Sequence, residues 1–328
     1  MINEPIAKKV LESGGFIKPL IIPSEYTDGS GLMNPSIFID GDNILVNLRH
    51  VNYTIWHSEK KKMLHEWGPL VYLHPENYQK LKTTNHYLEL DKNYNIKKHI
   101  PVDTTLLDVE PLWEFVGLED ARIIRWNDKL YLSGVRRDTT TNGQGRIELS
   151  EIVVDEYSVK EIKRYRLEPP LDKDSYCEKN WMPVVDKPFH YVKWTNPTEV
   201  VLADIETLST SQVHCKGEYV SGIRDIRGGS QVIPWKNGYI ALTHEVDLWY
   251  DSLNRKDGLY RHRVVTWDSN LENPQWGKHD FSFLGGNIEF CCGLALKDGM
   301  FLATFGFQDN SACLMGIPEK IIEELLEQ

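Results

Sequence analysis

The sequence predicts an all-β protein built as a five-bladed β-propeller, on three observations. Five segments share one plan: a polar group, an apolar strand, a turn rich in Asp, Asn, Gly or Lys, a second apolar strand and a second polar group. They start at residues 34, 119, 179, 227 and 288, so that 85, 60, 48 and 61 residues separate them, enough for two further strands each. Helical periodicity is confined to the two ends. Five units of about four strands fit a propeller, which shields sheet edges by radial repetition.

Each repeated segment has the turn chemistry of a tight hairpin between two runs of large apolar residues. The turns, in chain order, are Asp40-Gly41, Asn127-Asp128, Asp186-Lys187-Pro188, Asn237-Gly238 and Asp298-Gly299. The hairpins span 34–49, 119–137, 179–194, 227–245 and 288–306, and stretches at 85–100, 147–167 and 262–283 supply further strands. Short amphipathic helices are expected over 4–11 and 318–328.

No stretch rich in Pro, Gly or Ser divides the chain. We therefore expect residues 1–328 to form a single propeller domain, with a core over about 30–315 and short helical extensions at both ends. Two β-sandwich domains are the alternative, because a repeat of this kind does not by itself fix the topology.

Charge and hydropathy exclude several classes of protein. Thirty-seven Lys and Arg against 48 Asp and Glu give a net charge of −11, which disfavours non-specific binding to nucleic acid or anionic lipid. No apolar run approaches the ~18 residues that span a bilayer, and residues 1–12 carry charges where a signal peptide is apolar. The five cysteines are an odd number without CxxC spacing. We expect a cytoplasmic protein with no membrane partner.

In a propeller the innermost strand of each blade begins at the central channel, so the polar groups that flank the hairpins are expected to converge. The leading groups are Asn34, Glu119, Asp120, Lys179, Asn180, Arg227 and Glu289; the trailing groups are Arg49, Arg136, Arg137, His244, Glu245, Gln308 and Asp309. Such a set of cations, carboxylates and amides, ringed by Trp113, Trp181, Trp249 and Tyr260, suits a sugar with a phosphate. Strand-end charges that simply face water are the alternative reading.

Six motifs in order resemble glycoside hydrolase family 130, which contains β-mannoside phosphorylases and hydrolases on a five-bladed propeller. They are equally similar to the related glycosyltransferase family 108 and to a group of glycosyltransferases with RGGSQ and HEV signatures. The motifs, which cover about residues 30–315, are NPSI with Arg49, GLEDARI (117–123), EKNWMP (178–183), RGGSQVI (227–233), THEV (243–246) with YRHR (260–263), and GFQDNSA (306–312).

The resemblance implies that Asp120 is the general acid and base, although Ala121 replaces the family's usual Pro. A carboxyl beside Glu119 is expected to have the raised pKa that proton transfer to a glycosidic oxygen needs. The alternative is a strand-end Asp120 paired with Arg122.

The other matching positions divide into two sets. Asn34, Arg49, Glu119, Asn180 and Asp309 are expected to hold the reacting sugar, although turn capping also explains Asn34 and Asn180. Arg137, Lys179, His244 and Tyr260 resemble the phosphate-binding set of the phosphorylases, with Arg136 an equal claimant because a one-residue shift flips a strand side chain to the other face.

The preferred function is an inverting glycosyltransferase that moves a sugar from a phosphate-activated donor, a nucleotide sugar, to an acceptor hydroxyl deprotonated by Asp120. The first alternative is a phosphate-dependent phosphorylase of β-glycosides of the mannoside type, and the second is a non-catalytic carbohydrate-binding propeller. A hydrolase would need a second carboxylate, from Glu289 or Glu245. No cofactor or metal is expected, since Asp40 and Asp42 lie in a hairpin turn and no HExxH, GxGxxG or GxxxxGK motif occurs. The donor sugar stays open, as does the acceptor: a glycan, another hydroxyl compound or a modified nucleic acid.

Overall fold

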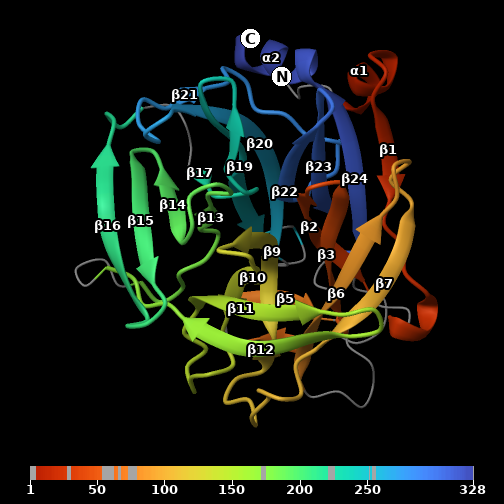
Figure 1. The fold of residues 1–328 in the computed structure, drawn as a ribbon, viewed down its shortest axis with the longest axis vertical. Helices are drawn as coiled ribbons and strands as arrows, with labels where there is room; N and C mark the ends of the chain where they lie inside the picture. The colour runs from red at the N-terminus through yellow and green to blue at the C-terminus, as the bar shows by residue number, and fades with distance from the viewer. Residues whose placement is uncertain are drawn as a thin grey trace.

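The sheets of the protein are arranged around a central axis as five blades (Figure 1). The computed structural model describes residues 5–27, 31–53, 63–65, 68–72, 80–170, 175–220, 226–250, 252 and 256–327. Among these residues the sheet topology is that of a five-bladed propeller, which confirms the predicted fold class.

Each blade is an antiparallel sheet whose first strand is the innermost. Blade 1 contains β2 (Leu32–Asp40), β3 (Asn43–Val51), β6 (Leu81–Leu90) and β7 (Ile96–Asp103). Blade 2 contains β9 (Leu118–Trp126), β10 (Lys129–Arg136), β11 (Arg146–Val154) and β12 (Val159–Arg166). Blade 3 contains β13 (Met182–Pro183), β14 (His190–Thr195), β15 (Thr198–Asp204) and β16 (Ser209–Lys216). Blade 4 contains β17 (Ile226–Arg227), β18 (Ile233–Trp235), β19 (Gly238–Tyr250), β20 (Lys256–Asp268) and β21 (Gln275–Trp276). Blade 5 contains β22 (Glu289–Lys297), β23 (Met300–Phe307), β24 (Ser311–Pro318) and β1 (Phe16–Pro19).

Three short strands complete the described set. β4 (Met63–His65) and β5 (Gly68–Tyr72) pair with each other, and β8 (Phe115–Val116) runs parallel to β6. Blades 1 and 2 are further joined by a short parallel pairing between β7 and β12, in which Val102 lies opposite Val159.

The five predicted hairpins are the five inner strand pairs of the blades. In blade 2 the turn residues Asn127 and Asp128 have φ of +47° and +63°, and in blade 5 Asp298 and Gly299 have φ of +52° and +74°. Two successive left-handed residues are the conformation that a two-residue hairpin needs, and Asn, Asp and Gly adopt it at least cost. The turn residues therefore specify the register of these hairpins.

The N-terminal strand closes the ring. β1 pairs with β24, with Phe16 opposite Gly316, so it becomes the outermost strand of the last blade. A Cβ atom at Gly316 would lie 2.1 Å from a ring carbon of Phe16, so glycine leaves the space that the ring occupies. The sheets thus run from Phe16 to Pro318, beyond the limits of 30–315 expected from the sequence, because a four-residue edge strand carries little pattern of its own.

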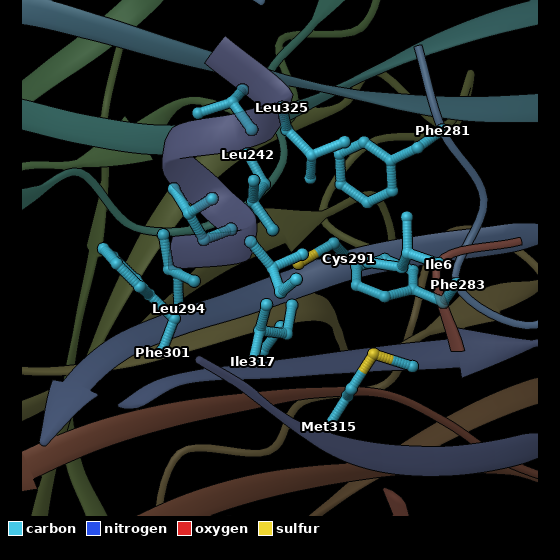
Figure 2. Packing of buried hydrophobic residues seen from close by; sticks show 14 of the residues in the cluster. Ile6, Leu242, Phe281, Phe283, Cys291, Leu294, Phe301, Met315, Ile317 and Leu325 are labelled. Atoms are coloured by element: carbon cyan, nitrogen blue, oxygen red, sulfur yellow. The ribbon is translucent and has the colours of Figure 1, made fainter. Parts of the chain in front are cut away.

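Both predicted helices are present, as α1 (Ala7–Glu12) and α2 (Glu319–Glu327). Ile6 and Val10 at one end of the chain, and Ile321, Ile322 and Leu325 at the other, are buried in one apolar cluster with side chains of blades 4 and 5. Figure 2 shows Leu325 and Ile6 beside Leu242, Phe281, Cys291 and Phe283. In the part of the chain that the structure describes, no helix is long and apolar enough to cross a membrane.

Gln231 satisfies backbone groups at the centre of the ring. Its side chain is fully buried, and its Nε2 donates to the carbonyl oxygens of Ile37 in β2 (2.8 Å) and Ile123 in β9 (3.0 Å). Its Oε1 accepts a hydrogen bond from the backbone N–H of Leu294 in β22 (3.2 Å). One amide from blade 4 therefore links the inner strands of blades 1, 2 and 5, whose inward-facing groups have no neighbouring strand to pair with.

We predict that Gln231→Leu destabilises the protein by at least about 2 kcal/mol, because two carbonyls and one N–H would be left buried and unpaired. The free energy of unfolding by urea would measure this loss. Gln275→Leu on the exposed outermost strand of the same blade is the control and should change stability by less than about 0.5 kcal/mol. Equal effects of the two substitutions would contradict this role of Gln231.

Candidate functional site

A cavity of about 390 Å³ lies where the inner strands of the five blades begin. Each blade contributes at least one residue at or next to the start of its inner strand: Asn34, Asp120, Asn180, Arg227 and Phe290. The other lining residues are Met33, Arg49, Tyr53, Phe115, Glu119, Arg137, Tyr176, Cys177, Lys179, His244, Tyr260 and Asp309. The volume is that of a small-molecule site.

Ten of the eleven predicted site residues line this cavity, and their roles stay predictions. The ten are Asn34, Arg49, Glu119, Asp120, Arg137, Lys179, Asn180, His244, Tyr260 and Asp309. Residues up to 275 positions apart in the chain (309 − 34 = 275) thus surround one volume, as the propeller hypothesis required.

Three of these residues occupy the same position in successive blades and share an uncommon backbone. Asn34, Asp120 and Asn180 have φ of +45°, +49° and +61°. Left-handed backbone costs free energy in residues other than glycine, although Asn and Asp tolerate it best. The strain directs the side chain of the residue at the inner end of each blade, and blades 1, 2 and 3 carry an amide, a carboxylate and an amide there.

Asp120 lies in a cationic and amide-rich environment. Its Oδ1 accepts hydrogen bonds from Asn34 Nδ2 (2.7 Å) and from an Nη of Arg49 (2.8 Å). Arg49 is itself buried, lies 3.7 Å from Glu119, and donates to the hydroxyls of Tyr53 (3.1 Å) and Thr83 (3.1 and 3.2 Å). The carboxylate of Asp120 therefore pairs with Arg49 and not, as the alternative reading supposed, with Arg122.

The pKa of Asp120 corrects the expectation from the sequence. Burial would raise it, but the charges of Arg49 and Arg122, the hydrogen bond from Asn34 and the charge of Lys179 outweigh burial, so the pKa lies below its usual value. The neighbouring Glu119 does not reverse this balance. In the free protein Asp120 is thus an ionised carboxylate at neutral pH, ready to accept a proton.

Arg137, Lys179 and Arg227 make another part of the cavity wall cationic. Arg137 donates to the carbonyl of Gly143 (2.9 Å) and to the hydroxyl of Tyr176 (3.2 Å), which hold its guanidinium in place. Among the residues that the structure describes, the Lys179 ammonium has no hydrogen-bond or ion-pair partner, and the residue is exposed. The wall can therefore bind an anion without first breaking an ion pair of Lys179.

His244 and Tyr260 form an aromatic part of the wall. Their rings are stacked, with centroids 5.7 Å apart, and Phe290 packs edge-on against His244 at 4.8 Å. Burial, with help from His262, Arg227 and Lys179, holds the pKa of His244 well below its usual value. Burial likewise raises the pKa of Tyr260. Both side chains are neutral at neutral pH, so they can offer an anion hydrogen bonds but no charge.

Three buried polar atoms of lining residues make no hydrogen bond within the described chain. They are Asn34 Oδ1, Asn180 Oδ1 and His244 Nδ1. Buried polar groups are normally paired, so these atoms are candidates for ligand contacts. They belong to both predicted sets, the sugar set and the phosphate set.

Arg136 is the predicted residue that the structure places elsewhere. It pairs with Glu148 (2.5 Å) and Asp138 (3.4 Å) and lines a separate cavity of about 400 Å³ between blades 1 and 2. Adjacent residues of an extended chain point to opposite faces, so only Arg137 reaches the candidate site.

The carboxylates considered for a hydrolytic base are also outside the candidate cavity. Glu289 accepts hydrogen bonds from the backbone N–H groups of Phe283, Leu284 and Gly286 (2.5 to 2.9 Å). Glu245 pairs with Arg263 at 2.7 Å. Both are therefore structural partners in blades 4 and 5.

The aromatic ring around the site was wrong in most of its members. Of the four predicted residues, Tyr260 lines the cavity, whereas Trp113, Trp181 and Trp249 do not. Trp181 is buried and donates its indole N–H to Glu178 (2.9 Å). Sequence reasoning missed Tyr53, Phe115, Tyr176 and Phe290, which line the cavity instead. Phe290 could have been found from its place beside Glu289 at the start of the fifth hairpin.

Among the residues that the structure describes, no group of three His, Cys, Asp or Glu side chains is arranged to hold a metal ion.

Comparison with solved structures finds carbohydrate-active enzymes over nearly the whole chain. A β-1,2-mannobiose phosphorylase from Listeria innocua, solved with β-1,2-mannobiose, is similar with a TM-score of 0.55 and 14% identity, over 95% of this chain and 96% of that one. A mannose phosphorylase from Leishmania mexicana, solved with a phosphate ion, gives 0.50 and 11%, over 95% and 92%. A glycosyl hydrolase from Bacteroides ovatus gives 0.56 and 14%, over 89% and 85%.

The chain shares the fold of these enzymes. The predicted resemblance to phosphorylase-type propellers is thereby confirmed for the fold, since identities of 11 to 14% establish no more than that. No family model and no curated protein sequence matches the chain.

We predict that inorganic phosphate raises the pKa of Asp120. A phosphate bound at the cationic wall would offset the positive charges that now lower this pKa, and a charge within ~4–6 Å shifts a pKa by roughly one unit or more. Carboxyl ¹³C NMR titration, with Asp120 assigned from the spectrum of Asp120→Asn, would measure the shift. The shift should be smaller in Lys179→Met, and a titration that phosphate leaves unchanged would contradict binding beside Asp120.

Proposed function

We propose that this protein is an inverting, phosphate-dependent phosphorylase of β-glycosides, of the mannoside type. The observation that carries the proposal is the presence, in one cavity, of the carboxylate Asp120 and a wall formed by Arg137, Lys179 and Arg227. A proton-transfer group and an anion-binding group beside one sugar are the two requirements of phosphorolysis. The fold shared with two named phosphorylases supports the same reading.

The geometry supports one sequence of steps. The sugar is held by the amides of Asn34 and Asn180 and by Arg49, and phosphate binds at the cationic wall. Asp120, which takes up a proton from solvent as the complex forms, donates it to the glycosidic oxygen, directly or through a sugar hydroxyl. A phosphate oxygen then bonds to the anomeric carbon from the opposite face while the carbon–oxygen bond to the leaving group breaks. The products are the α-sugar 1-phosphate and the free alcohol.

The low pKa of Asp120 in the free protein fits the reverse direction as directly. In synthesis, the ionised carboxylate takes a proton from the acceptor hydroxyl as phosphate departs. Burial then opposes the remaining charge, so the same group serves as acid or base according to whether an anion occupies the wall.

This proposal reverses the order of the functions expected from the sequence. The nucleotide-sugar transferase was preferred there, but the comparisons favour its alternative, since two similar structures are named phosphorylases and one of them was solved with phosphate. A hydrolase is less well supported, because neither Glu289 nor Glu245 lines the cavity.

The experiment that tests the proposal is incubation of the protein with β-mannosides, β-1,2-mannobiose among them, and inorganic phosphate, with sugar 1-phosphate as the measured product. Parallel incubations without phosphate, and with a panel of nucleotide sugars, separate the alternatives. Consumption of nucleotide sugars alone would restore the transferase. Release of free sugar without phosphate would indicate a hydrolase.

We predict that Asp120→Asn lowers kcat by about 10²–10⁴-fold, because it removes the proton donor. Sugar binding, measured by calorimetry, should persist, since the amide can still accept a hydrogen bond from Arg49. Unchanged turnover would remove Asp120 from the mechanism. Binding without turnover in the wild-type protein would favour the non-catalytic propeller.

We predict that Lys179→Met raises the KM for phosphate about 10-fold or more, because one charge-assisted hydrogen bond is lost. The KM for the glycoside should change little. Lys163→Met, on the exposed face of the outer strand β12, is the matched control and should leave both constants unchanged.

A further inference from the structure

We infer that Arg122 is a positioning residue that holds the backbone of Asp120 in its left-handed conformation and so aims the carboxylate at the sugar. The inference rests on the proposed function for the role of Asp120, and on hydrogen bonds of Arg122 for the rest. Arg122 does not line the cavity, and lies behind it.

The guanidinium of Arg122 joins three blades. One Nη donates to the backbone carbonyl of Asp120 itself (2.7 Å). Nε and the other Nη donate to the carbonyl of Gly229 in blade 4 (3.1 and 2.6 Å). The same group lies 5.6 Å from the ring centroid of Phe290 in blade 5. With 2% of its surface exposed, the planar fork is held on every side.

This arrangement acts on the one residue whose backbone is strained beside the chemistry. Asp120 has φ of +49°, a conformation that persists only when its surroundings enforce it. A hydrogen bond from Arg122 to the carbonyl of Asp120 fixes the peptide plane that follows the strained residue. The second carbonyl, that of Gly229, anchors the guanidinium to a different blade, so the orientation of Asp120 is referred to the ring as a whole.

Close packing around the anchor leaves the guanidinium no second position. A Cβ atom at Gly229 would lie 2.3 Å from the carbonyl oxygen of Leu242, and one at Gly228 would lie 1.9 Å from that of Asn180. The two glycines of the RGGSQ motif therefore let the chain approach blade 3 and the body of blade 4, which places the Gly229 carbonyl within reach of Arg122.

Arg125 provides a matched control on the same strand. It also crosses to a neighbouring blade, where it binds the carboxylate of Asp40 (2.8 and 3.0 Å), but at the far end of β9 from Asp120. Arg125→Met removes an inter-blade interaction of comparable chemistry without touching the backbone of Asp120. It separates a general loss of rigidity from a local loss of positioning.

The test compares Arg122→Lys, Arg122→Met and Arg125→Met with the wild-type protein. Lysine keeps the positive charge but cannot reach both carbonyls with a planar fork. We expect kcat for phosphorolysis to fall about 100-fold in both Arg122 variants, since small misplacement of a reacting group costs that much. The KM for phosphate should stay close to the wild-type value, and added guanidinium should partly restore kcat in Arg122→Met. Arg125→Met should retain wild-type kcat.

A second measurement does not depend on activity. If Arg122 positions Asp120, the pairing of Asp120 with Arg49 loosens in Arg122→Lys, and the carboxyl ¹³C titration of Asp120 moves to higher pH although the charge is retained. Wild-type kcat together with an unchanged titration in a folded Arg122→Lys protein would overturn the inference, as would an equal loss of kcat in Arg125→Met. If the wild-type protein performs no phosphorolysis, the proposed function fails, and the titration alone still decides the role of Arg122.

Discussion

The structure depends on how the inner strands satisfy their backbone where five sheets meet. In each blade the outer strands pair with one another, but the inner strands face the axis and have no ladder partner on that side. Side chains supply the missing groups. Gln231 serves three inner strands, and the Ser36 hydroxyl donates to the carbonyl of Ala121 (2.7 Å) and accepts from the N–H of Ile123 (2.9 Å). These bonds tie the blades into one ring, and they end just below the cavity.

The same constraint builds the site. The chain enters each inner strand through a residue near the axis, and in blades 1, 2 and 3 that residue is left-handed: Asn34, Asp120 and Asn180. A repeated backbone position thus carries different side chains, and only blade 2 carries an acid there. The repeat supplies the geometry, while the identity of one residue in each blade supplies the chemistry.

Electrostatics explains why an anion would matter to this site. Asp120 is buried among Arg49, Arg122 and Lys179, and these charges keep its pKa low despite burial. His244 and Tyr260 are neutral, so the positive potential of the wall comes from Arg137, Lys179 and Arg227. A bound anion would reduce that potential and make protonation of Asp120 easier. Binding of phosphate and proton transfer by Asp120 are therefore coupled through charge.

The sequence by itself determined the hairpins, their turns and the membership of the site, because turn residues and alternating apolar runs act locally and the motifs recur once per blade. It could not decide between Arg136 and Arg137, which differ by one step of a strand, nor which aromatic residues reach the cavity. The direction of the pKa shift of Asp120 depends on Arg49, which is 71 residues away in the chain (120 − 49 = 71). Closure by Phe16–Pro19 likewise depends on an edge of β24 that exists only after the ring has formed. Distances between residues far apart in the chain set these properties, and only tertiary structure fixes such distances.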